Sequence, residues 1–141
     1  MEKKLLVLSK IAKALNEHHI TWALGASGML YFNGITASFH DLDNMVSEAC
    51  IEEAKAALSA LGCPLERKPN PQYQTKHFLE YTIDCVEVDV IAGFVIVKDG
   101  ISHPAPFDET HIEKSVTVNG QTVPLQRLSD WAGYYALMGR H

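Results

Sequence analysis

The segment LGASGMLYFNGITASFHDLD, from Leu24 to Asp43, contains the features that decide the predicted fold. It begins at the end of Ile20–Leu24, a short apolar run whose residue types favour a buried strand. Gly25–Gly28 then breaks the apolar pattern, and the short apolar segment Met29–Phe32 predicts a helix. Asp41–Val46 predicts a second strand. In this order of strand, turn, short helix and strand, the turn and the acids of the second strand can meet at the ends of adjacent strands.

The other expected elements lie on both sides of this segment. They are helices at Glu2–His18, at Glu48–Leu61 with Ser47 as N-cap and from Ser129, as N-cap, through Met138; strands at Lys76–Ile83 and Cys85–Ala92; a surface loop at Pro64–Gln72; and hairpins over Phe94–Ile101 and Ser115–Val123. The dipeptides Asp-Gly and Asn-Gly mark the two hairpin turns. Helices that alternate with strands, followed by a run of strands, predict the α/β or α+β class with a mixed sheet flanked by helices.

Length and composition limit the class of protein. The chain has 141 residues and a mass of 15.6 kDa, so we expect a single domain over residues 1–141. Hydrophobic residues make up 47% and charged residues 21%, which is typical of soluble globular proteins. The apolar runs are too short to span a bilayer, Met1–Lys4 does not begin a signal peptide, and the three cysteines form no CxxC pair. We therefore expect a cytoplasmic protein with reduced thiols and no membrane association.

The charge balance argues against a nucleic acid polymer as a partner. Lysine and arginine number 12 against 17 acidic residues, which gives a net charge of −5 with neutral histidines. A surface that binds a nucleic acid duplex needs clustered cations, and the sequence has no such cluster. An acidic protein can still bind phosphates when a metal ion supplies the positive charge.

Alternating acids in two predicted strands form the main candidate site. Asp41 and Asp43 are two residues apart, so both carboxylates project from one strand face, where they repel each other unless a cation binds. Glu87 and Asp89 alternate with valines in the later strand and can supply a third carboxylate. Carboxylates of this kind bind Mg²⁺, often together with substrate phosphates. The alternative is that these acids have no function beyond lying on the solvent-exposed faces of half-buried strands.

The turn Gly25–Gly28 is a second candidate feature. Small residues between a strand and a helix allow backbone N–H groups to approach a phosphate closely, and Ser27 adds a hydroxyl group. The turn lies one short helix before the Asp-Leu-Asp motif.

Together, Leu24–Ile35 and the following His40-Asp41-Leu42-Asp43 resemble the signature of the nucleotidyltransferase superfamily with the polymerase-β-like fold. In that signature a strand ends in a Gly-Ser turn, a short helix and Asp-x-Asp follow, and a third Asp lies on a later strand. The resemblance is strongest to small bacterial members, including the minimal and the antibiotic-modifying nucleotidyltransferases. It covers Ile20–Ala92, and Trp131–Arg140 is similar to the C-terminal helix of the family.

The resemblance implies a role for each residue of the motif. Gly25 and Ser27 would hold the triphosphate of an NTP, and Asp41 and Asp43 would bind Mg²⁺. Asp89 would complete the metal site and help to activate the acceptor hydroxyl group. The implied reaction transfers a nucleoside monophosphate to a small hydroxylated molecule or a protein side chain and releases pyrophosphate.

Two alternatives remain open from the sequence. Many relatives carry an Arg before Asp-x-Asp and a Lys in the last helix, whereas Thr36–Phe39 has no basic residue; Lys76 and Arg140 are the candidate substitutes. The absence of these cations favours a catalytically weak or inactive binding or regulatory module, as in a toxin–antitoxin-like pair. A metal phosphohydrolase using the same acids is the third candidate. The sequence specifies neither the nucleotide nor the acceptor nor the oligomeric state.

Overall fold

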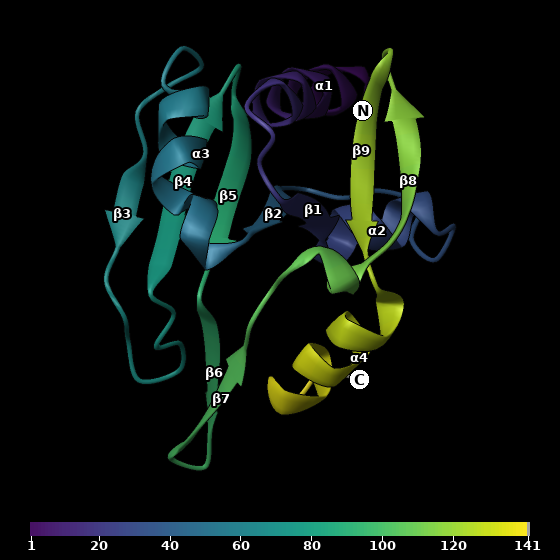
Figure 1. The fold of residues 1–141 in the computed structure, drawn as a ribbon. Coiled ribbons are helices and arrows are strands. Elements are labelled where there is room, and N and C mark those ends of the chain that lie inside the picture. Colours follow the sequence, from purple (N-terminus) through teal and green to yellow (C-terminus); the bar gives the residue numbers. More distant parts are fainter. Residues whose placement is uncertain (141) are drawn as a thin grey trace.

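The computed structural model describes residues 1–140 and consists of a large mixed sheet, a separate hairpin and flanking helices (Figure 1). The seven-stranded sheet has the order β3-β4-β5-β2-β1-β9-β8. Its strands are β1 (Trp22–Gly25), β2 (Leu42–Val46), β3 (Leu65–Arg67), β4 (His77–Ile83), β5 (Val86–Ala92), β8 (Ile112–Val118) and β9 (Gln121–Gln126). The pairs β2–β5 and β1–β9 are parallel and the other pairs antiparallel. The predicted mixed sheet flanked by helices is therefore confirmed.

The remaining elements cover the sheet or extend from it. They are the helices α1 (Glu2–Glu17), α2 (Ala26–Phe32), α3 (Ile51–Leu58) and α4 (Leu128–Leu137), the 3₁₀ turns η1 (Glu48–Cys50) and η2 (Glu109–His111), and the hairpin strands β6 (Phe94–Lys98) and β7 (Ile101–Ala105). Figure 1 shows α1 and α3 together and α4 apart from them, near the hairpin. No helix within residues 1–140 is long and apolar enough to cross a membrane.

The alternation in β5 separates the core from the candidate site. Val86, Val88 and Val90 are buried, whereas Glu87 is exposed and Asp89 is half-buried. On β1, the Trp22 indole faces α1, where its Nε1 donates to the Asn16 side chain at 2.9 Å. Asp43 and Asp89 lie on the opposite face of the sheet, which is therefore the face of α4 and of the candidate site.

Several expected boundaries need correction. The predicted loop Pro64–Gln72 contains the edge strand β3, whose residues are exposed, so no buried alternation marks it in the sequence. Arg127, rather than Ser129, is the N-cap of α4, because the chain leaves β9 directly into the helix. Asp41 lies just before β2 instead of within it. The expected helix from Glu48 begins with η1 and its α-helical part ends at Leu58.

The two hairpin predictions agree with the structure. The turns lie at Asp99-Gly100 and Asn119-Gly120, and all four residues have positive φ angles. The three cysteines are free, as expected.

Candidate active site

Three carboxylates, from β2, from the residue before it and from the neighbouring β5, converge on one face of the sheet. The parallel register of β2 and β5 places Asp43 directly beside Asp89, and Asp41 joins them from the residue before Leu42. One carboxylate oxygen from each acid lies within 4.8 Å of the other two. The cluster therefore combines the Asp-Leu-Asp motif with an acid that lies far away in the sequence, as the sequence analysis expected.

The electrostatics of this cluster favour a cation. Burial raises the pKa of Asp43 well above its ordinary value, and the neighbouring charges of Asp41 and Asp89 raise it further. Burial also raises the pKa of Asp89, although a hydrogen bond with Asp43 opposes this effect. Close carboxylates screened from water cannot all remain charged without compensation. An oxygen-preferring divalent cation such as Mg²⁺ fits this donor set, since it would replace mutual repulsion with attraction.

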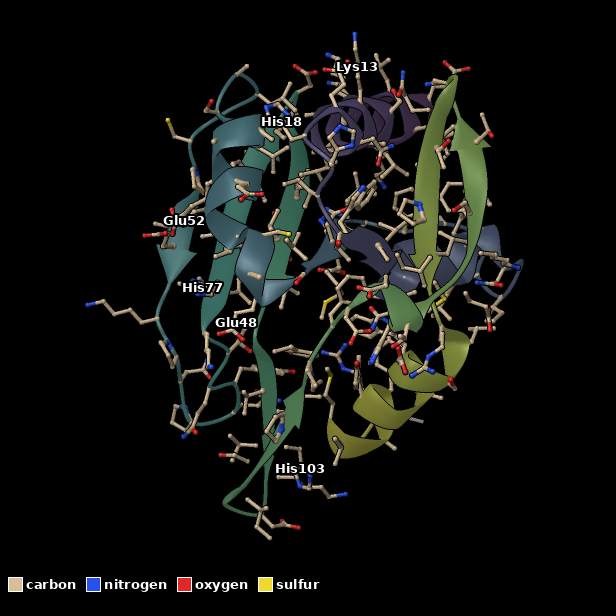
Figure 2. The ribbon with its side chains drawn as sticks, in the orientation of Figure 1. Lys13, His18, Glu48, Glu52, His77 and His103 are labelled. Carbon is tan, nitrogen blue, oxygen red and sulfur yellow. The ribbon has the colours of Figure 1, made fainter. Side chains whose placement is uncertain are left out.

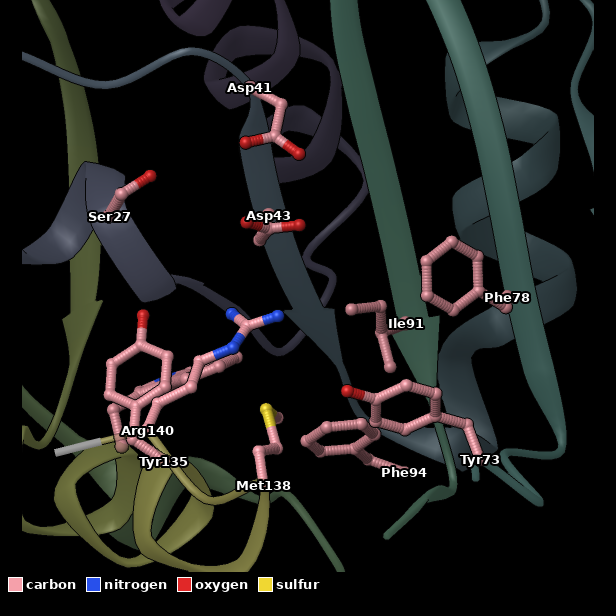
Figure 3. A pocket seen from close by; sticks show the side chains of 11 residues that line it. Ser27, Asp41, Asp43, Tyr73, Phe78, Ile91, Phe94, Tyr135, Met138 and Arg140 are labelled. Carbon is pink, nitrogen blue, oxygen red and sulfur yellow. The ribbon is translucent and has the colours of Figure 1, made fainter. Parts of the chain in front are cut away.

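A cavity of about 320 Å³ adjoins Asp41 and Asp43 (Figure 3). Its polar lining also includes Ser27, from the first turn of α2, and Arg140, which follows α4. In Figure 3 the Arg140 guanidinium extends toward Asp43, and its positive charge lowers the pKa of that carboxyl group, against the larger effect of burial. The cavity thus has a polar end with acids, a hydroxyl group and one guanidinium.

The rest of the cavity lining is largely aromatic. Trp131 and Phe94 are stacked with ring centroids 6.1 Å apart, and Phe94 and Tyr73 are stacked at 6.2 Å. Tyr135 also lines the cavity, and burial raises the pKa of its phenol above the ordinary value. A row of aromatic faces next to a polar end is suited to a ligand with a flat ring and a charged group.

Gly25 has a packing reason to lack a side chain. It pairs with Asp43 across β1 and β2, and a Cβ atom built on it would lie 2.5 Å from Nε1 of Trp131. The indole therefore occupies the space that a side chain at this position would need. Next to it, Ala26 has a φ of 50°, a left-handed conformation that costs a residue with a Cβ about 1–2 kcal/mol. Strain of this kind concentrates at functional sites.

We expect Gly25→Ala to destabilise the protein by about 1–3 kcal/mol, because the new methyl group overlaps the Trp131 indole in a packed region. Gly133→Ala is the matched control, since a Cβ at this exposed position of α4 meets no atom within 4 Å and alanine favours a helix. Urea unfolding of both variants measures the difference. Equal stability of Gly25→Ala and the parent would contradict the tight contact.

Of the two cations considered in the sequence analysis, only one reaches the cavity. Arg140 lines it, whereas Lys76 lies 3.0 Å from Glu48 in an ion pair. Figure 2 shows Glu48 near β4 and α3, away from α4. Sequence position could not place Arg140, because its approach depends on how α4 crosses the sheet.

The histidines within the described residues 1–140 form no metal site with the acids. His18, His77 and His103 lie on separate elements (Figure 2). The exposed His40 lies 3.4 Å from Glu87 rather than beside Asp89. Among residues 1–140, no histidine belongs to a cluster of metal-ligating side chains.

Comparison with solved structures identifies the fold. A Thermotoga maritima protein, TM1012, named provisionally as a nucleotidyltransferase, superposes with a TM-score of 0.81 and 23% identity, over 97% of this chain and 85% of its own. The chain has the nucleotidyltransferase fold. The crystal structure of ANT(2'')-Ia in complex with adenylyl-2''-tobramycin matches with a TM-score of 0.63 and 15% identity, over 95% of this chain and 77% of that one.

The solution structure of ANT(2'')-Ia, described as an antibiotic-resistance factor, matches the same nucleotidyltransferase fold with a TM-score of 0.65 and 15% identity. This match covers 99% of this chain and 75% of the other. No protein-family model matches the sequence, and no curated protein does.

Proposed function

We propose that this protein is a Mg²⁺-dependent nucleotidyltransferase that transfers a nucleoside monophosphate from an NTP to the hydroxyl group of an acceptor. The observation that carries the proposal is the convergence of Asp41, Asp43 and Asp89 within 4.8 Å, with Asp41 and Asp43 at the polar end of a cavity with aromatic walls. The nucleotidyltransferase fold supports it, since the same fold occurs in a structure that contains an adenylylated small molecule.

The three acids are the residues that would hold Mg²⁺. The raised pKa values of Asp43 and Asp89 support this assignment, because the folded protein disfavours uncompensated negative charge on these two carboxyl groups. A Mg²⁺ ion held by these acids would supply positive charge that neutralises the negative charge developing during phosphoryl transfer.

The side chains around the acids suit the phosphates and the acceptor. The Ser27 hydroxyl, the Gly25 turn and the Arg140 guanidinium would bind and orient the triphosphate, in addition to the metal. Asp89 would accept the proton of the acceptor hydroxyl group, since its carboxylate belongs to the cluster of three acids beside which the acceptor would bind. The acceptor oxygen then forms a bond to the α-phosphorus, the bond to the β-phosphate oxygen breaks, and pyrophosphate leaves.

A second cavity is a candidate binding place for the acceptor. It has a volume of about 360 Å³, shares Asp41 with the first cavity, and also contacts Asp89. Its other lining includes Glu87 and the ion pair between Arg67 and Glu80. The proposed base Asp89 thus faces a space separate from the aromatic cavity. A small hydroxylated molecule or an exposed protein side chain fits this arrangement.

The experiment that tests the proposal incubates the protein with each NTP, Mg²⁺ and a panel of hydroxylated small molecules and proteins. Release of pyrophosphate with a mass increase of one nucleoside monophosphate on an acceptor is the expected result. Release of inorganic phosphate would indicate the phosphohydrolase instead. Failure of every NTP to bind at millimolar concentration would overturn the proposal and favour the non-catalytic binding module.

We expect Arg140→Ala to raise the KM for the NTP about 10–100-fold, because one charge-assisted hydrogen bond to phosphate contributes about 1.5–3 kcal/mol. Arg140→Lys, which keeps the charge and loses the planar fork, should lie between Arg140→Ala and the parent. Lys98→Ala is the control, since this exposed cation lies at the end of β6. Initial rates over a range of NTP concentrations measure the effect. An unchanged KM in Arg140→Ala would remove this residue from the phosphate site.

A further inference from the structure

A buried side-chain network joins the end of β9 to α4. Gln126, the last residue of β9, is completely buried, and its Oε1 accepts a hydrogen bond from Nε1 of Trp131 at 2.8 Å. Its Nε2 donates to Oδ2 of Asp130 at 3.2 Å and to the Tyr134 hydroxyl at 3.3 Å. Both ends of this amide are therefore used. Because a buried indole N–H needs an acceptor, the amide specifies one orientation of the Trp131 ring.

Asp130 in turn is held from the other side. Its Oδ1 accepts from Nη2 of Arg127 at 2.7 Å and from Nε at 3.2 Å, and His111 Nδ1 lies 3.4 Å from Oδ2. Only 9% of the Asp130 side chain is exposed. A charge-assisted pair of this kind restricts the carboxylate, which then restricts the Gln126 amide.

The opposite end of the network touches the candidate active site. The register of β1 with β9 pairs Leu24 with Leu125, so Gln126 lies next to Gly25, and Gly25 pairs with Asp43. Among these paired residues, the Trp131 indole occupies the space that a side chain on Gly25 would need. It thus stands beside the metal-ligand candidate Asp43 and forms part of the cavity wall.

We propose that Gln126 and Asp130 are positioning residues for nucleotide binding, which act by fixing the orientation of Trp131. The inference rests on the proposed function, because it assumes that the cavity lined by Trp131 binds the NTP. A rotated indole would change the cavity at two places: beside the Gly25 turn, and along the aromatic row through its contact with Phe94.

The first test is Gln126→Leu, which removes every hydrogen bond of the amide and retains most of its volume. We expect the KM for the NTP to rise about tenfold, while kcat at saturating NTP changes less than threefold. In the absence of nucleotide, the NMR resonance of the Trp131 indole N–H proton should shift relative to that of the parent protein. The Trp22 indole N–H donates a hydrogen bond to Asn16 on the other face of the sheet, so its resonance should stay unchanged and serves as the control for folding.

The second test exchanges donor and acceptor within the network. Gln126→Glu retains an acceptor for the Trp131 indole and places two carboxylates together, so we expect it to raise the KM. Adding Asp130→Asn to Gln126→Glu restores one donor and one acceptor between the two positions and should recover at least half of the loss in logarithmic terms. This rescue also tests the proposal if Gln126→Leu does not fold.

Three outcomes are distinguishable. An unchanged KM in a folded Gln126→Leu protein would overturn the positioning role while leaving the proposed function intact. Absence of rescue by the double exchange would also overturn it, because a simple loss of stability would explain the single variants. If the parent protein binds no NTP, the proposed function fails and the positioning role falls with it.

Discussion

The double variant Asp41→Ala/Asp43→Ala is expected to lose Mg²⁺-dependent NTP binding and to transfer nucleotide at least about a thousandfold more slowly, a loss of ~4 kcal/mol in transition-state stabilisation. These two acids supply two of the three carboxylates that converge within 4.8 Å. A single remaining Asp89 cannot hold a divalent cation and orient phosphates as the complete cluster could. Equilibrium binding of labelled NTPs with and without Mg²⁺, together with pyrophosphate release, measures the effect.

The matched control is Glu2→Ala/Glu17→Ala, which removes the same number of negative charges from exposed positions of α1. It should bind and transfer nucleotide like the parent. If the control loses activity equally, net charge rather than the cluster is responsible. If the aspartate variant retains metal-dependent binding, the assignment of Asp41 and Asp43 as metal ligands is wrong.

The part of the site that could be predicted from the sequence depends on local rules. Alternation in a strand places Asp89 and Glu87 on the face opposite the valines, and the structure agrees. Which of these two acids joins Asp43 is a question of register between distant strands. The structure pairs Asp43 with Asp89 and leaves Glu87 exposed near His40. From the sequence, Asp89 could be chosen over Glu87 as the third acid only through the family resemblance.

The features that could not be predicted depend on contacts between distant segments. From the sequence, Gly25 is interpreted as a residue that lets a phosphate approach the backbone closely. The sequence does not indicate that the Trp131 indole, from α4, occupies the space of a side chain at this position. Gln126 looks like an ordinary polar end of a strand until its amide is seen between Trp131 and Asp130. No periodic pattern encodes such a network, because each member lies in a different local context.

The metal-free protein should become more stable when Asp43 loses its charge. Burial and the neighbouring acids raise the pKa of Asp43 well above its ordinary value, so the charged form is disfavoured in the folded state. Asp43→Asn removes this charge with little change in shape. We expect its free energy of unfolding at pH 7 without metal to rise by at least about 1 kcal/mol, or roughly 3–5 °C in Tm.

The pH dependence has a definite sign. A carboxyl group with a raised folded-state pKa binds protons more tightly in the folded state than in the unfolded state, so its contribution to stability grows as the pH falls. For Asp43 and Asp89 this gain occurs between their raised pKa values and the ordinary value near 4. The metal-free parent should therefore gain stability from pH 7 toward pH 5, and Asp43→Asn should gain less.

Added Mg²⁺ should reverse the order of the two proteins. The parent gains stability from the metal at pH 7, because binding to the folded state alone shifts the unfolding equilibrium, whereas Asp43→Asn lacks a ligand and gains little. Thermal unfolding with EDTA and with millimolar Mg²⁺, at pH 5 and pH 7, compares the four conditions. Glu17→Gln is the control for loss of one exposed charge. If Asp43→Asn is less stable than the parent at pH 7 in EDTA, the carboxylate makes a favourable contact in the folded protein, and the repulsion that calls for a cation is absent.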